Sequence, residues 1–136
     1  MRDDATRLQD PQAPSDTAGR GRPAWSLGVA EASRRIAAGD LTPAELVDSV
    51  LARIEAVDGA VRSYIRVMAD EARAAAAEAT ADIAAGRWRG PLHGIPFGVK
   101  DNYDVAGVPA TAASHARLGR VPARDAALVT ALKEAG

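Results

Sequence analysis

The sequence contains no cysteine and few aromatic residues, and both shortages restrict its chemistry. Without cysteine, a disulfide, a thiolate metal site and a thiol nucleophile are excluded. Aromatic residues make up 4% of the chain, and they are not interleaved with basic residues as in a platform for single-stranded nucleic acid. The histidines, His93 and His115, lack the helical spacing of a zinc protease, and neither is assigned a role. We therefore expect no cofactor, no metal and no nucleic acid bound directly by this chain.

Long apolar runs and an excess of charge of one sign are missing as well. No stretch approaches the roughly 20 apolar residues of a membrane-spanning helix, and the N-terminus lacks the apolar core of a signal peptide. The formal net charge is -1, which gives no general attraction to anionic lipid or nucleic acid. We expect a cytoplasmic protein with no membrane partner, and its 136 residues suffice for one domain with a modest core.

Residues 1–24 are polar, mixed in charge and rich in proline and glycine, without any periodicity. Such a segment cannot bury enough apolar surface to offset the entropy lost on ordering. We therefore predict a disordered tail over residues 1–24, with an address signal as the alternative, and an ordered region over residues 25–136.

Two helices are predicted at the start of the ordered region. Ser26 is expected to cap the first helix, which ends at Gly39. Thr42 and Glu45 match the capping box of a second helix, which we expect to stop at Asp58 and the glycine after it. Apolar residues three and four positions apart form one core-facing stripe on this helix: Leu46, Val47, Val50, Leu51, Ile54 and Val57.

Two further helices and about two strands follow. An alanine-rich helix is expected to end at Gly86, and Asp125 is expected to cap a last helix. The last helix should turn three apolar side chains inward: Leu128, Val129 and Leu132. The β-branched stretch 61–67 and the apolar run 95–100 are the predicted strands.

Lys100 stands at the end of the second predicted strand. In a strand, Pro96, Gly98 and Lys100 share one face, opposite the apolar residues between them. Because Gly98 has no side chain, it leaves space beside Lys100 for another segment or a substrate. Asp101 and Asn102 follow directly and offer polar partners, although a plain turn explains them equally well. The alternative for Lys100 is a surface lysine paired weakly to Asp101.

The stretches LTPAELVDSVLARIEAVDG, GPLHGIPFGVKDNYDVAGVPATAAS and RDAALVTALKEAG resemble the N-terminal portion of the amidase signature family. The resemblance covers roughly residues 26–136 and implies an α/β/α fold with a central mixed sheet. It also implies amide hydrolysis through a Ser–cis-Ser–Lys triad, in which Lys100 matches the catalytic lysine and Gly98, Asp101 and Asn102 are supporting residues. The glycine- and serine-rich segment of that triad is missing from this chain, so residues 25–136 are expected to be a domain truncated at its C-terminal end. Ser114 matches a loop serine of the family rather than the nucleophile, and alanine at 113 stands where glycine is commoner.

A lysine can act as a general base only in its neutral form. The ordinary lysine pKa is roughly 10.4, whereas a useful base near neutral pH has a pKa of about 7 to 8. Burial in a medium of low dielectric constant disfavours the charged form. We therefore expect the apolar run and Gly98 to help form a dry site around the amine of Lys100.

Three functions are compatible with these residues. The first is an amidase that acts on a small-molecule amide through an acyl-serine intermediate, and it is compatible with a homo-oligomer. The second is an amidotransferase A subunit, which releases ammonia from glutamine with the same triad. The third is a non-catalytic helical module that binds a partner through its apolar stripes.

We predict that the 136-residue polypeptide alone does not hydrolyse simple amides, because the two serines are missing. Robust lysine-dependent turnover would contradict this account. The DNA beyond codon 136 provides a second measurement. An open frame encoding a Gly-Gly-Ser-Ser-Gly-like segment would support the amidase, whereas an immediate stop codon would support the helical module.

Overall fold

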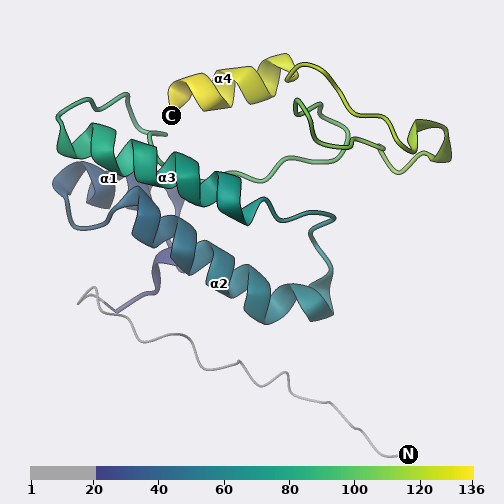
Figure 1. Cartoon of the computed structure of the whole chain (residues 1–136). Helices are drawn as coiled ribbons and strands as arrows, with labels where there is room; N and C mark the ends of the chain where they lie inside the picture. Colours follow the sequence, from purple (N-terminus) through teal and green to yellow (C-terminus); the bar gives the residue numbers. More distant parts are fainter. Residues whose placement is uncertain (1–20) are drawn as a thin grey trace, which may run out of the picture.

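The computed structural model describes residues 21–136, which form α-helices, two short 3-10 helices and long loops (Figure 1). The helices in chain order are η1 (Ala24–Ser26), α1 (Val29–Ala38), α2 (Pro43–Val61), α3 (Ala69–Ala84), η2 (His115–Arg117) and α4 (Ala127–Ala135). The tail predicted over residues 1–24 lies, up to residue 20, outside the described residues. None of the helices in the described part is long and apolar enough to cross a bilayer.

The helices α2 and α3 pack along each other, and η1 also contacts α2. In the view of Figure 1, α4 lies on the opposite side of α3 from α2. The core lies between α1, the beginning of α2 and the end of α3, where Ile83 and Ile95 pack against the buried side chains. These buried side chains are Ala32, Ile36, Leu41 and Leu46. Because Ile95 belongs to this cluster, the core anchors the beginning of the segment that contains Lys100.

The first helix ends as predicted but does not begin as predicted. Its N-cap is Gly28, two residues after Ser26, and the Ser26 side chain belongs to η1, where its hydroxyl donates a hydrogen bond to the Pro23 carbonyl (2.8 Å). At the other end Gly39 adopts the left-handed conformation (φ 77°), and its N–H donates to the Ile36 carbonyl. A glycine is suited to this position because it has no Cβ to clash with the backbone.

The capping box of α2 is confirmed, whereas the predicted stop is wrong. The Glu45 N–H donates to Thr42 Oγ1 (3.2 Å), and the Thr42 N–H donates to Glu45 Oε2 (2.8 Å). The helix continues through Asp58 and ends at Val61. The Asp58 carboxylate accepts a hydrogen bond from the N–H of Ser63 (2.7 Å), so this side chain stabilises the chain just beyond the helix instead of interrupting the helix.

Helix α3 uses its alanines for close packing on one side only. Ala76 and Ala79 are buried, whereas the alanines on the other side of α3 are exposed to solvent. Thr80 lies on the packed side, and its Oγ1 accepts a hydrogen bond from the Ala44 N–H at the beginning of α2 (3.3 Å). The predicted end of the helix is confirmed, since Gly86 follows it with a φ of 78°.

The predicted cap of the last helix is wrong. Helix α4 begins at Ala127, and Asp125 instead accepts hydrogen bonds from the Ala106 N–H and from Lys133 Nζ. Of the three apolar side chains expected to face inward, Val129 is buried, but Leu128 is 48% exposed.

The two predicted strands are not formed within residues 21–136. Residue 61 still belongs to α2, and the residues after it lie at the surface, with Ile65 85% exposed. The run 95–100 has no regular secondary structure, and its Phe97 and Val99 side chains are exposed. A strand needs a neighbouring strand to accept and donate its backbone hydrogen bonds, and the described residues do not provide one. The alternation therefore predicted neither the ladder nor a buried face correctly here, since of the apolar residues in 95–100 only Ile95 packs against the core of the described residues.

The turn 90–94 packs closely against the beginning of α2, and Gly94 is the residue that permits it. Its φ is +79°, and a Cβ at this position would overlap Pro43 Cγ and lie 2.7 Å from Pro43 Cβ. Pro43 begins α2 and is itself almost completely buried, so it cannot move aside without disturbing the core.

We predict that Gly94→Ala lowers the free energy of unfolding by about 3 kcal/mol, because it adds a steric overlap to the cost of a left-handed alanine. The matched control is Gly107→Ala, since Gly107 has a similar φ of +74° but no atom within 4 Å of the place that a Cβ would occupy. The control should cost only about 1 kcal/mol. Equal losses in urea unfolding would show that the contact with Pro43 is unimportant.

Candidate active-site segment

The segment with Lys100 is extended up to the lysine and then turns sharply. The Tyr103 N–H donates to the Lys100 carbonyl (2.9 Å), which closes a turn around Asp101 and Asn102. The Lys100 side chain is exposed, so the described residues do not enclose its amine. Asn102 is also exposed within the turn, which agrees with the plain turn role.

Gly98 is open on its side-chain face, as the sequence predicted. The nearest atom to a Cβ placed there is the Tyr64 hydroxyl, at 4.0 Å. Tyr64 belongs to the loop between α2 and α3, so this loop lies beside the lysine segment. Sequence reasoning did not find Tyr64, because residues 61–67 were assigned to a strand, and a spatial neighbour more than 30 positions away leaves no local pattern.

Asp101 binds the backbone and side chain of Thr111 instead of Lys100. The Thr111 N–H donates to Asp101 Oδ1 (3.0 Å), and the Thr111 hydroxyl donates to Oδ2 (2.7 Å). The Ala112 N–H adds a hydrogen bond to the Asp101 carbonyl (3.2 Å). The Thr111 hydroxyl, and then its N–H, hold the pKa of the Asp101 carboxyl below its ordinary value, because both donors favour the charged form. A weak surface pair between Lys100 and Asp101 is therefore not what the geometry shows.

The loop held by Asp101 contains two consecutive alanines in the left-handed conformation. Ala112 has a φ of 51° and Ala113 a φ of 56°. The Thr111 hydroxyl oxygen accepts the Ala113 N–H (3.2 Å), and the Thr111 carbonyl accepts the Ser114 N–H (2.9 Å). A left-handed alanine costs about 1–2 kcal/mol, so this conformation depends on the hydrogen bonds of Thr111. The sequence pointed to the unusual alanine at 113, but Thr111 was missed. A hydroxyl residue two positions before Ala113 was the local signal for a side chain that could bind its N–H.

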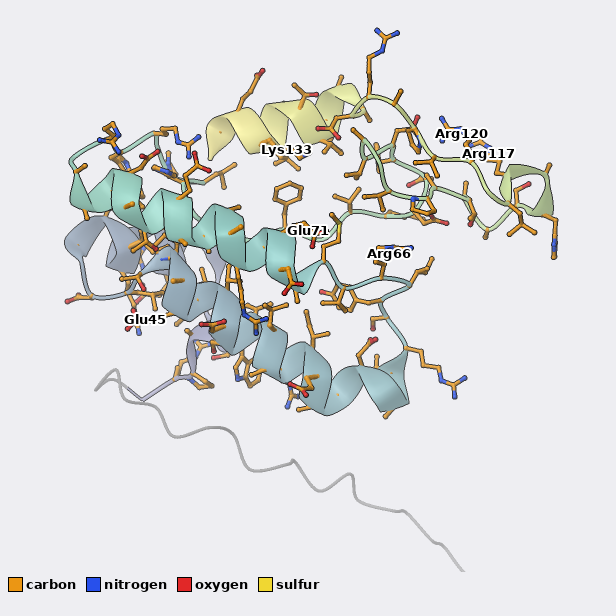
Figure 2. All side chains as sticks on the ribbon, in the orientation of Figure 1. Glu45, Arg66, Glu71, Arg117, Arg120 and Lys133 are labelled. Carbon is orange, nitrogen blue, oxygen red and sulfur yellow. The ribbon has the colours of Figure 1, made fainter. Side chains whose placement is uncertain are left out.

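Two other carboxylates fix the loop between Lys100 and α4. Asp104 forms two hydrogen bonds with the guanidinium of Arg120 (2.6 and 2.5 Å), which lowers the pKa of this carboxyl. Figure 2 shows Arg120 on the loop that leads to α4, close to Arg117. Asp125 accepts the Ala106 N–H (2.8 Å). In the described residues, no group of three His, Cys, Asp or Glu side chains is arranged to hold a metal ion.

The model of the amidase family matches residues 45–136, which include Lys100, Asp101 and Thr111. This chain belongs to the amidase family. It is 41% identical over 111 residues to an amidase of Pseudomonas putida, covering 81% of this chain and 23% of the relative. It is 44% identical over 110 residues to the A subunit of the glutamyl-tRNA(Gln) amidotransferase of Anaeromyxobacter sp. (strain K), covering 81% of this chain and 22% of that protein.

Among solved structures, the native peptide amidase of Stenotrophomonas maltophilia is similar, with a TM-score of 0.75 and 38% sequence identity. That alignment covers 84% of this chain and 24% of the peptide amidase. The chain therefore spans about a quarter of the length of the relatives it matches. The similarity is consistent with the predicted fold class, although the two strands are not confirmed within the described residues.

We predict that Ala113→Gly stabilises the protein by about 0.5–1 kcal/mol, because glycine relieves the left-handed strain at some cost in backbone entropy. The control is Ala77→Gly on the exposed side of α3, where the same substitution should destabilise by about 1 kcal/mol. Urea unfolding measures both changes. A loss of stability in both variants would mean that the φ of Ala113 is not strained.

Proposed function

We propose that this chain provides the general base, Lys100, of an amide-hydrolysing enzyme. The observation that supports the proposal is the position of Lys100 in the segment GVKDN, within the part of the chain that matches the amidase family. Both carboxylate oxygens of the neighbouring Asp101 are engaged by Thr111, so the amine is not held in a pair with Asp101. Lys100 is thus available to a hydroxyl that approaches it.

The proposed reaction needs two serines that this chain does not provide in a matching segment. In its neutral form the Lys100 amine accepts the proton of a bridging serine, which in turn accepts the proton of the attacking serine. The attacking oxygen forms a bond to the amide carbon, and the C–N bond then breaks as the leaving amine takes up a proton. Water hydrolyses the resulting acyl-serine and releases the acid.

Asp101 and Thr111 are proposed to orient the turn that follows the base. Their hydrogen bonds fix the direction of the backbone directly after Lys100, and Gly98 keeps the face before it open toward Tyr64. General bases contribute only when they lie within hydrogen-bonding reach of the proton they remove. The hydrogen-bonded turn directly after Lys100 helps to meet that requirement.

We expect Lys100→Ala to lower kcat/KM for amide hydrolysis by about 10²–10⁴-fold in the protein encoded by the complete open reading frame. Lys100→Arg should not restore activity, because a guanidinium stays protonated and cannot accept a proton. The substrates to compare are a small peptide amide and glutamine. A preference for glutamine would indicate the amidotransferase alternative.

Arg66→Ala is the control for this experiment. Arg66 is another exposed cation, and Figure 2 places it on the loop between α2 and α3. Its removal changes the net charge as Lys100→Ala does, and activity should be retained. Undiminished hydrolysis by Lys100→Ala would refute the proposed role of the lysine.

A further inference from the structure

His93 is completely buried in the turn 90–94, seven residues before Lys100. Both of its ring nitrogens face N–H groups of one residue. The Arg89 backbone N–H donates to Nδ1 (3.1 Å), and the Arg89 Nε–H points at Nε2 (3.1 Å). The Trp88 ring covers the imidazole at a centroid distance of 5.7 Å.

The charged groups around His93 come from its own loop and from α3. Arg89 contributes a positive charge, whereas Asp82 of α3 contributes a negative one. Asp82 is itself paired with Arg87 (2.7 Å) and lies 3.8 Å from Arg89, so cations already surround it. Burial, and then the charge of Arg89, lower the pKa of His93, and Asp82 opposes this only in part.

The end of α4 is attached at the same point. The Gly94 N–H donates to the Gly136 carbonyl (2.7 Å). A Cβ on Gly136 would lie 2.5 Å from His93 Cα, so the two backbones are in direct contact. The part of the chain at the end of α4 that contacts His93 is therefore the backbone of Gly136.

The beginning of α4 is attached beyond the lysine. The Ala126 N–H donates to the Asp104 carbonyl (2.8 Å), and Asp125 accepts the Ala106 N–H (2.8 Å). The segment 94–104, with Lys100 inside it, is thus tied at both ends to one helix. In Figure 1 the segment runs below α4 from the C-terminal end of the helix toward its beginning.

We propose that His93 is a positioning residue: its neutral ring holds the junction of the 90–94 turn with the end of α4, and protonation of the ring releases this end of the Lys100 segment. An imidazolium has an N–H on both nitrogens and no acceptor. The neutral ring has one acceptor, Nδ1, for the Arg89 backbone N–H, and protonation removes this acceptor so that an N–H faces an N–H; it also buries a second positive charge beside the guanidinium. The contact of Gly136 with the turn would loosen, and the position of Lys100 would become less defined, although Ile95 in the core and the fit of Gly94 against Pro43 still hold the start of the segment. This inference rests on the proposed function of Lys100.

The direction of the pH dependence follows from the lowered pKa of His93. The ordinary histidine pKa is about 6.5, and the folded protein binds the proton more weakly than the unfolded chain does. The stabilisation by neutral His93 is therefore complete above about pH 6.5 and is lost as the pH falls from there toward the pKa of the folded state. Acid, and not base, should loosen the junction.

The test compares the pH profiles of kcat and KM for three variants of the protein encoded by the complete open reading frame. His93→Ala should lower kcat about tenfold at neutral pH with little change in KM, because the lysine is displaced while substrate binding is not. His93→Asn provides an acceptor for the Arg89 N–H without titrating. It should recover much of kcat, and on the acid side its log kcat should fall with the slope of one proton, that of Lys100, whereas the unsubstituted protein should fall more steeply because His93 also binds a proton. His115→Asn is the matched control, because His115 is exposed in η2 and should leave both parameters and the profile unchanged.

Nuclear magnetic resonance of the unsubstituted protein covers the case in which His93→Ala fails to fold. The ring signals of His93 should titrate below the ordinary histidine range, and the amide signals of Gly94 and Gly136 should shift in the same pH interval. Titration of His93 in the ordinary range without those shifts would overturn the inference. Loss of activity in Lys100→Ala together with an unchanged acid limb in His93→Asn would overturn it while leaving the proposed function intact. Undiminished activity in Lys100→Ala would instead refute the proposed function itself.

Discussion

The contact between the 90–94 turn and the beginning of α2 determines where the lysine segment starts. Gly94 fits against Pro43 only because it lacks a Cβ, and the same residue donates its N–H to Gly136 at the end of α4. One small residue therefore joins α2, α4 and the chain that leads to Lys100. Packed interiors do not deform continuously, so a close contact of this kind fixes the direction of the chain that leaves it.

Beyond Lys100 the path of the chain is fixed by hydrogen bonds to aspartate side chains more than by apolar packing. Asp101, Asp104 and Asp125 each bind a donor more than nine positions away, and two of them bind backbone N–H groups. An exposed ion pair stabilises by less than about 1 kcal/mol, whereas a backbone N–H without a partner is costly. The hydrogen bonds to backbone amides are therefore the more important part of this set. They give a loop of little regular structure a defined path to α4.

Most local signals at helix ends were reliable, with the expected stop at Asp58 as an exception, whereas signals that need a neighbouring strand were not. The capping box at Thr42 and the glycine ends of α1 and α3 depend on residues within one turn, and the sequence predicts them correctly. Ser26 and Asp125 have the right chemistry for caps, but each has a better partner elsewhere. The two strands failed because alternation predicts which residues share a face but not whether a neighbouring strand exists. Lys100 was singled out through a family resemblance, whereas Thr111 was missed although its hydroxyl, two positions before Ala113, was a local signal.

Lys100 and its apolar neighbours Phe97 and Val99 are all exposed to solvent in the described residues, and a neutral lysine requires that this exposure be removed. A neutral amine near neutral pH requires that water be removed from around it, and the described residues leave both Lys100 and Phe97 in contact with solvent. Phe97 and Val99 point to the opposite face of the extended segment from Gly98 and Lys100, so a surface packed on these apolar side chains would hold the segment from one side and leave the bare glycine for a second surface that reaches the amine. Burial of apolar area favours such packing by about 25 cal/mol per Å², which is a source of free energy for desolvating a charge. The apolar run thus supplies free energy that holds the segment in place, and the open face at Gly98 is where the amine of Lys100 can be covered and kept dry.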